Sequence, residues 1–141
     1  MKTPLHIVIA ICSAAILAAA VVELYDVSFT PIRERFASGD SIVIRRVQAT
    51  SSDLKIGDTV LVHGTYTLRS QSSARLGLSL TTKGPGGPKP VSPRAWSKID
   101  KGSGTFMLEY IVHSPGSLHV SFYPSSPGSS FGGVYFRSVD N

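Results

Sequence analysis

The sequence predicts an all-β fold: an antiparallel β-sandwich of about seven strands, immunoglobulin-like or jelly-roll, preceded by one N-terminal apolar helix. Beyond residue 40, apolar and polar residues alternate with a period of two, which is the pattern of half-buried strands. Gly, Pro and Ser gather between these segments, as the tight turns of an antiparallel sheet require. A small sheet closed on itself is the alternative architecture.

The chain begins with an apolar run over residues 7–22. Its length lies between that of a signal-peptide core, about 7–15 residues, and that of a spanning helix, about 17–25. Extended over residues 5–24, the run would anchor the protein in a membrane. The small residue Ala20 would instead allow cleavage of the run as a signal peptide. We therefore expect an anchor or signal peptide here, with the uncleaved anchor favoured.

Charges around the run predict its orientation. Lys2 precedes it, whereas Glu23 and Asp26 follow it, which favours a cytoplasmic N-terminus. The prediction is a single-pass membrane protein with an extracytoplasmic domain, or a secreted or periplasmic protein after cleavage. The single cysteine, Cys12, lies within the run, so the exported part would fold without a disulfide.

The rest of the chain divides by composition. Residues 1–23 are the anchor or signal peptide, residues 24–40 are expected to form a tether, and residues 41–141 the β-sandwich domain. Pro31 and the turn cluster Ser38–Gly39–Asp40 favour an irregular tether.

Alternation assigns faces to the strands. The residues expected in the core are Val60, Val62, Tyr66, Leu68, Leu76, Leu78, Leu80, Phe106, Leu108, Tyr110, Val112, Leu118, Val120, Phe122, Val134 and Phe136. Those expected to face solvent include His63, Glu109, His113, His119, Ser121 and Tyr123. Segments 41–50, 94–99 and 131–139 are weaker strand candidates. Pro115 and Gly116 predict a turn that joins 105–112 to 118–123 as a hairpin.

One stretch carries a resemblance. Residues 54–68, LKIGDTVLVHGTYTL, resemble the early strand of bacterial immunoglobulin-like modules, in which a Gly-Asp turn precedes a long alternating strand. This resemblance is architectural and implies only the fold.

No motif predicts catalysis. The exported part has no cysteine and no G-x-S-x-G elbow, and Ser52 with Lys55 matches S-x-x-K only in a loop. His63, His113 and His119 are the residues that would bind a metal, but spacing fixes no acidic partner for them. We therefore expect no catalytic residue, metal or cofactor. An enzyme would need a site formed only in three dimensions.

Two features favour binding. Basic residues gather between 83 and 101, and aromatic residues lie in or beside the expected loops 83–101 and 124–133. The candidate ligand or partner contacts are Lys83, Lys89, Arg94, Trp96, Lys98, Lys101, Tyr123, Phe131 and Tyr135. With a net charge of +5, such a surface would attract an anionic glycan, and the aromatic rings would stack on sugars. Nucleic acid is not expected, because basic and aromatic residues are not interleaved.

The sequence thus predicts a non-catalytic module, membrane-tethered or secreted, for binding or assembly in the cell envelope. Its partner would be an envelope protein or an anionic glycan. The alternatives are an envelope hydrolase or metal-binding enzyme, and a structural subunit that pairs through an edge strand such as 41–50.

Overall fold

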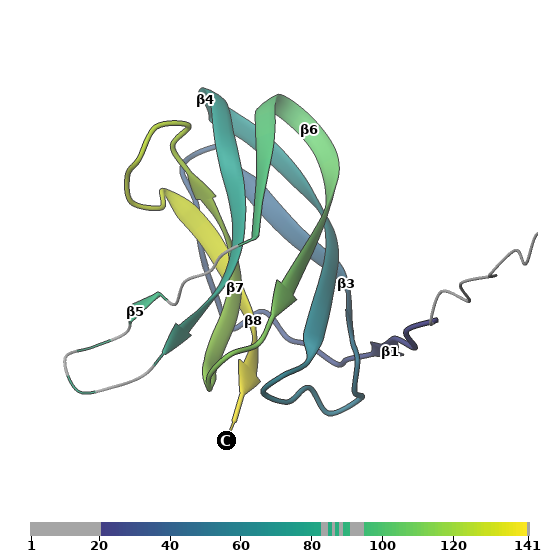
Figure 1. Cartoon of the computed structure of the whole chain (residues 1–141). Coiled ribbons are helices and arrows are strands. Elements are labelled where there is room, and N and C mark those ends of the chain that lie inside the picture. Colours follow the sequence, from purple (N-terminus) through teal and green to yellow (C-terminus); the bar gives the residue numbers. More distant parts are fainter. Residues whose placement is uncertain (1–20, 83–84, 86, 88, 91–94, 141) are drawn as a thin grey trace, which may run out of the picture.

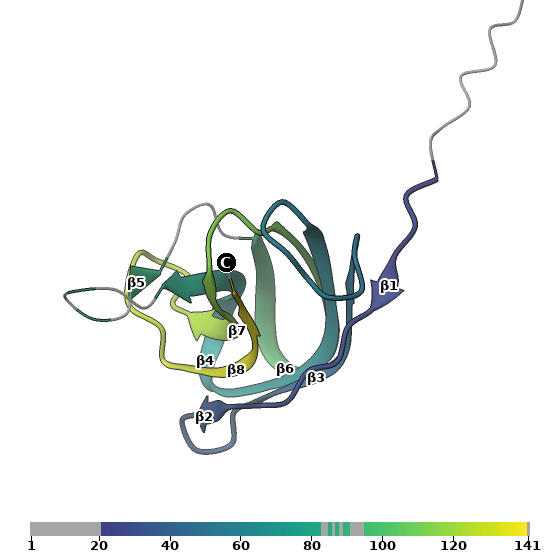
Figure 2. The ribbon, with the colours of Figure 1, turned by 90° about the horizontal axis from the view of Figure 1, so that it is seen from below.

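The computed structural model describes residues 21–82, 85, 87, 89–90 and 95–140. This part of the chain is all-β, and its antiparallel sheet curls strongly on itself (Figures 1 and 2). Of the expected N-terminal helix, the residues up to Ala20 fall outside the described part of the chain, and residues 21–24, which are described, form neither helix nor strand. Within the described residues, no helix has the length and apolarity needed to cross a membrane.

The strands belong to one continuous sheet. They are β1 (Tyr25–Asp26), β2 (Arg33–Arg35), β3 (Ser41–Ala49), β4 (Thr59–Thr82), β5 (Lys89–Pro90), β6 (Ala95–Ile111), β7 (Gly116–Tyr123) and β8 (Gly132–Val139). The order is β1-β3-β4-β7-β8-β2, and β5 and β6 also pair with β4. The antiparallel all-β prediction is confirmed, but a sandwich of two separate sheets is not.

The long strand β4 produces the curl. Sequence alternation predicted two strands here, whereas the structure has one. Its first half pairs with β3 and its second half, Arg75–Thr81, pairs with β7 along the same edge. Strand β6 follows the opposite edge, with a register shift between Leu68 and Ser73. Because β4 exchanges one neighbour for another, the sheet folds back over itself (Figure 2).

The segment expected as a tether is part of the sheet. Strand β1 pairs with β3, and β2 pairs with β8. Between them, the Val27 N–H donates to Val47 O at 2.8 Å and the Thr30 N–H donates to Phe136 O at 3.0 Å. Val27 is buried. These pairings are too short to produce an alternation pattern, which is why the sequence did not reveal them.

The core contains the residues that alternation assigned to it. All of them are buried except Tyr66, which is half-buried and packs against the core. Phe122 lies at its centre, with an edge contact to Phe36 and a stacked contact to Phe131.

Strand β7 corrects the prediction for its other face. His119, Ser121 and Tyr123 were expected in solvent but are buried, with 4%, 5% and 5% exposure. Strand β7 lies between β4 and β8, so side chains from both neighbours surround this second face as well. Alternation distinguishes two faces of a strand, but it does not show whether both are covered.

The expected hairpin between 105–112 and 118–123 is wrong. Residues 102–111 of β6 pair with the first half of β4, whereas β7 pairs with its second half and with β8. Residues 112–115 therefore connect β6 to β7 without a hairpin pairing between the two strands (Figure 1).

Candidate functional site

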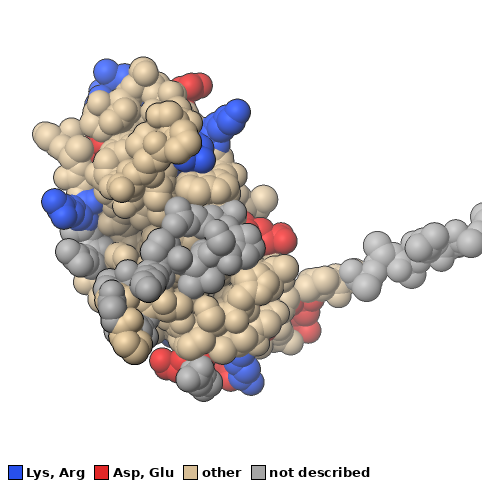
Figure 3. All heavy atoms as spheres, turned by 60° about the vertical axis from the view of Figure 1, so that its left-hand side comes forward, with Lys and Arg blue, Asp and Glu red and all other residues tan. Residues whose placement is uncertain are grey.

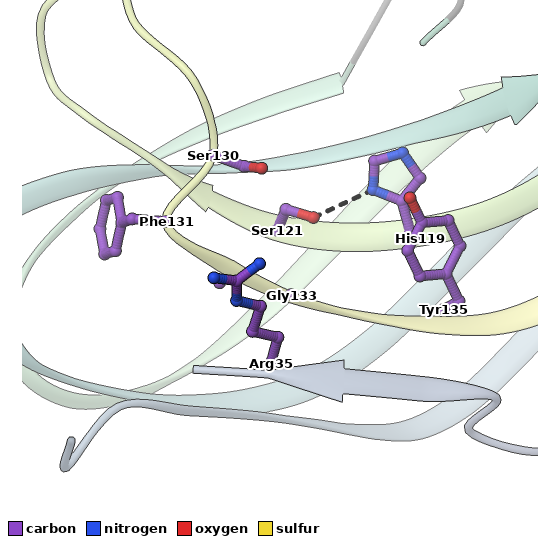
Figure 4. A pocket seen from close by; sticks show the side chains of 8 residues that line it. Arg35, His119, Ser121, Ser130, Phe131, Gly133 and Tyr135 are labelled. Atoms are coloured by element: carbon purple, nitrogen blue, oxygen red, sulfur yellow. Dashed lines mark hydrogen bonds between the residues drawn. The ribbon is translucent and has the colours of Figure 1, made fainter. Parts of the chain in front are cut away.

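A hollow of about 320 Å³ opens on the outer face of β7 and β8 (Figure 4). Its lining comes from β2, β7, β8 and the loop that precedes β8. The lining residues are Arg35, His119, Ser121, Ser130, Phe131, Gly132, Gly133 and Tyr135. This volume is at the lower end of the range for small-molecule sites. We take this hollow, called the β7–β8 hollow below, as the candidate site.

Two glycines, Gly77 and Gly133, lie on either side of Ser121 on the outer face. Strand pairing places Trp96, Gly77, Ser121, Gly133 and Arg35 in one row across β6, β4, β7, β8 and β2. A Cβ on Gly133 would overlap the Ser121 hydroxyl and lie 2.8 Å from Val120 O. The Ser121 side chain therefore occupies the place that a side chain at position 133 would take, and only glycine fits beside it.

Strand geometry directs Arg35 to this face. The next residue, Phe36, packs into the core, with its ring centroid 6.2 Å from that of Phe122. Because neighbouring residues of an extended chain point to opposite sides, Arg35 points outward. In Figure 4 its guanidinium extends over Gly133 toward Ser121. Among the described residues, no carboxylate forms an ion pair with Arg35.

His119 forms the floor on the other side of the hollow. Its Nδ1 lies 3.0 Å from the Ser121 hydroxyl, and its Nε2 lies 3.1 Å from the Ser79 hydroxyl and 2.9 Å from that of Thr81. The Tyr135 ring lies against the imidazole, with centroids 4.8 Å apart. These contacts fix the imidazole and, through it, the position of the Ser121 hydroxyl.

The loop before β8 is anchored to the core by Phe131. The Phe131 N–H donates to Phe122 O at 3.0 Å, and the two rings stack with centroids 5.6 Å apart. Ser130, exposed, precedes this anchored residue. Loop 124–133 was expected to take part in recognition, and residues 130–133 do line the hollow.

Trp96 belongs to a neighbouring cluster. Its ring lies over Gly77, contacts Tyr123 edge-on at 4.9 Å, and has the Arg75 guanidinium 4.4 Å from its centroid. Arg75 also donates to Pro124 O. Trp96 is 40% exposed, but Arg75 and Tyr123 occupy much of its surface. Trp96 and Tyr123 therefore support the face beside the hollow and do not line it.

The structure brings together only part of the predicted contact set. Phe131 and Tyr135 line the hollow, and Lys98 and Lys101 are exposed in β6 instead of a loop. Lys89 lies in β5, but its side chain is not described, and Lys83 and Arg94 fall outside the described residues. In Figure 3, the described lysines and arginines on the visible face are scattered among uncharged and acidic residues.

Sequence reasoning missed Arg35, Ser121, Ser130 and Gly133. Arg35 was placed in a solvated tether and Ser121 on a plain solvent face. The pair Gly132–Gly133 at the start of β8 was the available signal, because glycine within a strand marks a close approach or an open space beside the backbone.

The arrangement offers recognition chemistry. Within the described part of the chain, no three His, Cys, Asp or Glu side chains are grouped closely enough to hold a metal ion. Of the candidates His63, His113, His119 and Glu109, only His119 lines the hollow. The Ser121–His119 contact resembles a nucleophile and base, and among the described side chains the other imidazole nitrogen contacts the hydroxyls of Ser79 and Thr81.

Comparison with known proteins adds no further assignment: no protein-family model, curated protein or solved structure matches this chain.

Proposed function

We propose that this protein is a non-catalytic binding module of the cell envelope that holds a saccharide in the β7–β8 hollow. The single observation that carries the proposal is the composition of the hollow, which joins the Tyr135 ring, several hydroxyls and one guanidinium on a paired sheet. Sugars present CH faces that pack on aromatic rings and hydroxyls that both donate and accept hydrogen bonds.

The hydroxyls suit such a ligand. Ser130 and Tyr135 make no hydrogen bond to any described side chain, so both can donate to and accept from a ligand. Ser121 presents a hydroxyl whose position is set by His119. The site stands on β7 and β8, whose pairing extends over most of both strands. A rigid site loses little entropy when a ligand binds.

The proposal extends to location. The N-terminal apolar run would hold the sheet outside the cytoplasm, where saccharide polymers are found, either as an anchor or before cleavage near Ala20. If the two halves of the curled sheet pack as a sandwich, or if the sheet closes on itself, the β7–β8 hollow would lie at the surface of the domain. The envelope hydrolase remains the alternative, and the Ser121–His119 contact is the feature that favours it.

The test uses the full chain in detergent micelles and saturation-transfer NMR with disaccharides and trisaccharides, both neutral and acidic. We expect saturation transfer to at least one of them. Ser130→Trp should abolish it by filling the hollow, and Ser126→Trp, in the same loop but away from the hollow, should not. Loss of signal in both variants or in neither, or no transfer to any saccharide at millimolar concentration, would contradict the proposal.

A further inference from the structure

We infer that the β7–β8 hollow selects an acidic sugar and that Arg35 holds the ligand's carboxylate; this inference rests on the proposed saccharide binding. Arg35 is the only charged residue that lines the hollow in the described part of the chain. A lone cation at the wall of a binding site, with neutral polar groups around it, favours a ligand with one negative charge.

Geometry supports a carboxylate in particular. The guanidinium presents parallel N–H donors that match the two oxygens of a carboxylate. Arg35 is exposed, and its side chain extends over Gly133 toward Ser121 (Figure 4), so a ligand can reach the guanidinium from solvent. A phosphate monoester, which the same N–H fork also fits, carries about −1.5 to −2 charges at neutral pH, and this single guanidinium would neutralise only one of them.

The residues around Arg35 indicate where the sugar ring would lie. With the carboxylate on Arg35, a pyranose would lie over Gly133 beside Tyr135, its hydroxyls within reach of Ser121 and Ser130. The hollow would then take one or two sugar units of a longer chain, since its volume of about 320 Å³ leaves no room for more. The ligand class is therefore a uronic acid or a comparable carboxylated sugar within a polymer.

Arg35 can be substituted without disturbing the fold. It is exposed, and no described side chain pairs with it. Its backbone position in β2 is fixed by pairing with Gly133, which a glutamine would retain. Arg45 is an exposed arginine of β3 that does not line the hollow, so it provides a matched control.

The experiment measures binding of digalacturonate, its dimethyl ester, and the corresponding neutral digalactose by calorimetry on the full chain in detergent. The ester keeps the sugar's shape and removes its charge. We expect the acid to bind at least about tenfold more tightly than the ester, because a hydrogen bond to a charged group contributes more than 1.4 kcal/mol, which is tenfold in affinity. Arg35→Gln should remove this preference, and Arg45→Gln should keep it.

Different failures distinguish the two proposals. Equal binding of acid, ester and neutral disaccharide would overturn the role of Arg35 and leave saccharide binding standing. A preference that Arg35→Gln retains would also overturn it. Tighter binding of a galactose sulfate than of the galacturonate would overturn the choice of carboxylate. No binding of any disaccharide, to the wild type or to either variant, would overturn both proposals.

Discussion

The carboxylate of Asp40 joins the start of β3 to Ser70, at the point where β4 leaves one neighbour for the next. Its Oδ1 accepts the backbone N–H groups of Ser70 and Arg69 at 3.0 and 2.7 Å, and its Oδ2 accepts the Ser70 hydroxyl at 2.5 Å. Asp40 is buried. These N–H groups lie beyond Thr67, the last residue of β4 that pairs with β3, and before Arg75, where pairing with β7 begins, so Asp40 supplies an acceptor where neither strand does.

Asp40→Ala should therefore destabilise the protein. Removal of the carboxylate leaves two backbone donors without their acceptor, which costs about 1–3 kcal/mol of unfolding free energy. Asp40→Asn, which keeps one oxygen acceptor, should cost less. Urea unfolding followed by tryptophan fluorescence measures both. Ser72→Ala, an exposed neighbour in β4, serves as control and should stay within about 0.5 kcal/mol of wild type. Equal stability of Asp40→Ala and Ser72→Ala would show that Asp40 does not hold the bend.

The same carboxyl predicts sensitivity to acid. Burial by itself would raise the pKa values of Asp40 and Asp58, but hydrogen bonds lower both pKa values below their usual range. The donors to Asp40 are Ser70 and the backbone of Arg69. Asp58 receives the Lys55 N–H at 2.6 Å and the hydroxyls of Thr50 and Ser51.

A carboxyl whose folded pKa lies below its unfolded pKa binds fewer protons in the native state, so stability falls as pH falls. The contribution is fully present above the unfolded pKa, about 4, and is lost as pH drops through the lowered folded value. We expect the urea midpoint to be constant from pH 7 to 5 and to decrease below pH 4. The decrease should be smaller in Asp40→Asn and Asp58→Asn. A midpoint that rises on acidification would contradict the assignment.

Alternation in the sequence revealed the strands that bury one face. It missed the features that depend on contacts between residues far apart in the chain. Alternation placed Val60, Leu78 and Val120 in the core because a half-buried strand repeats every two residues. It did not show that β4 continues through its bend, because residues 69–72 are polar, and because Arg69 and Ser70 are held by Asp40, which is distant in sequence.

The candidate site was predictable only in part, for the same reason. Phe131 and Tyr135 were recognised as aromatic residues near a loop. Arg35 enters the hollow because β2 pairs with β8, and this three-residue strand leaves no periodic signal. His119 was assigned to solvent because its buried hydroxyl partners come from β4, far away in the chain.

His119 should matter for stability. Its imidazole contacts the hydroxyls of Ser79, Thr81 and Ser121, all buried. His119→Ala leaves these hydroxyls without that partner, so we expect a loss of about 1–3 kcal/mol in unfolding free energy. The control is His113→Ala, an exposed residue that should lose less than about 0.5 kcal/mol. If His119→Ala and His113→Ala were equally stable, the hydrogen bonds of His119 would not contribute to the stability of the fold.

Gly64 is required by close packing in the first half of β4. A Cβ there would collide with Val43 O and lie 2.6 Å from Cζ of Phe106. The adjacent strand β3 has its irregularity at this point, between Ile44 and Arg46. Because a backbone oxygen cannot move away easily, Gly64→Ala should destabilise by about 1–3 kcal/mol. Thermal and urea unfolding measure the loss, and stability equal to wild type would contradict the packing described.

Gly133 and Ser121 should be energetically coupled, because a Cβ at Gly133 meets the Ser121 side chain directly. Gly133→Ala alone should cost about 1–3 kcal/mol by overpacking. Ser121→Gly removes the two side-chain atoms that the new methyl would strike and leaves the Val120 carbonyl in place, so the double variant should lose less than the sum of the single losses. We expect a coupling energy of about 1 kcal/mol, within the range found for contacting residues. A double-mutant cycle by urea unfolding measures it, and strict additivity would mean that the Val120 carbonyl, 2.8 Å from the same Cβ, sets the cost alone.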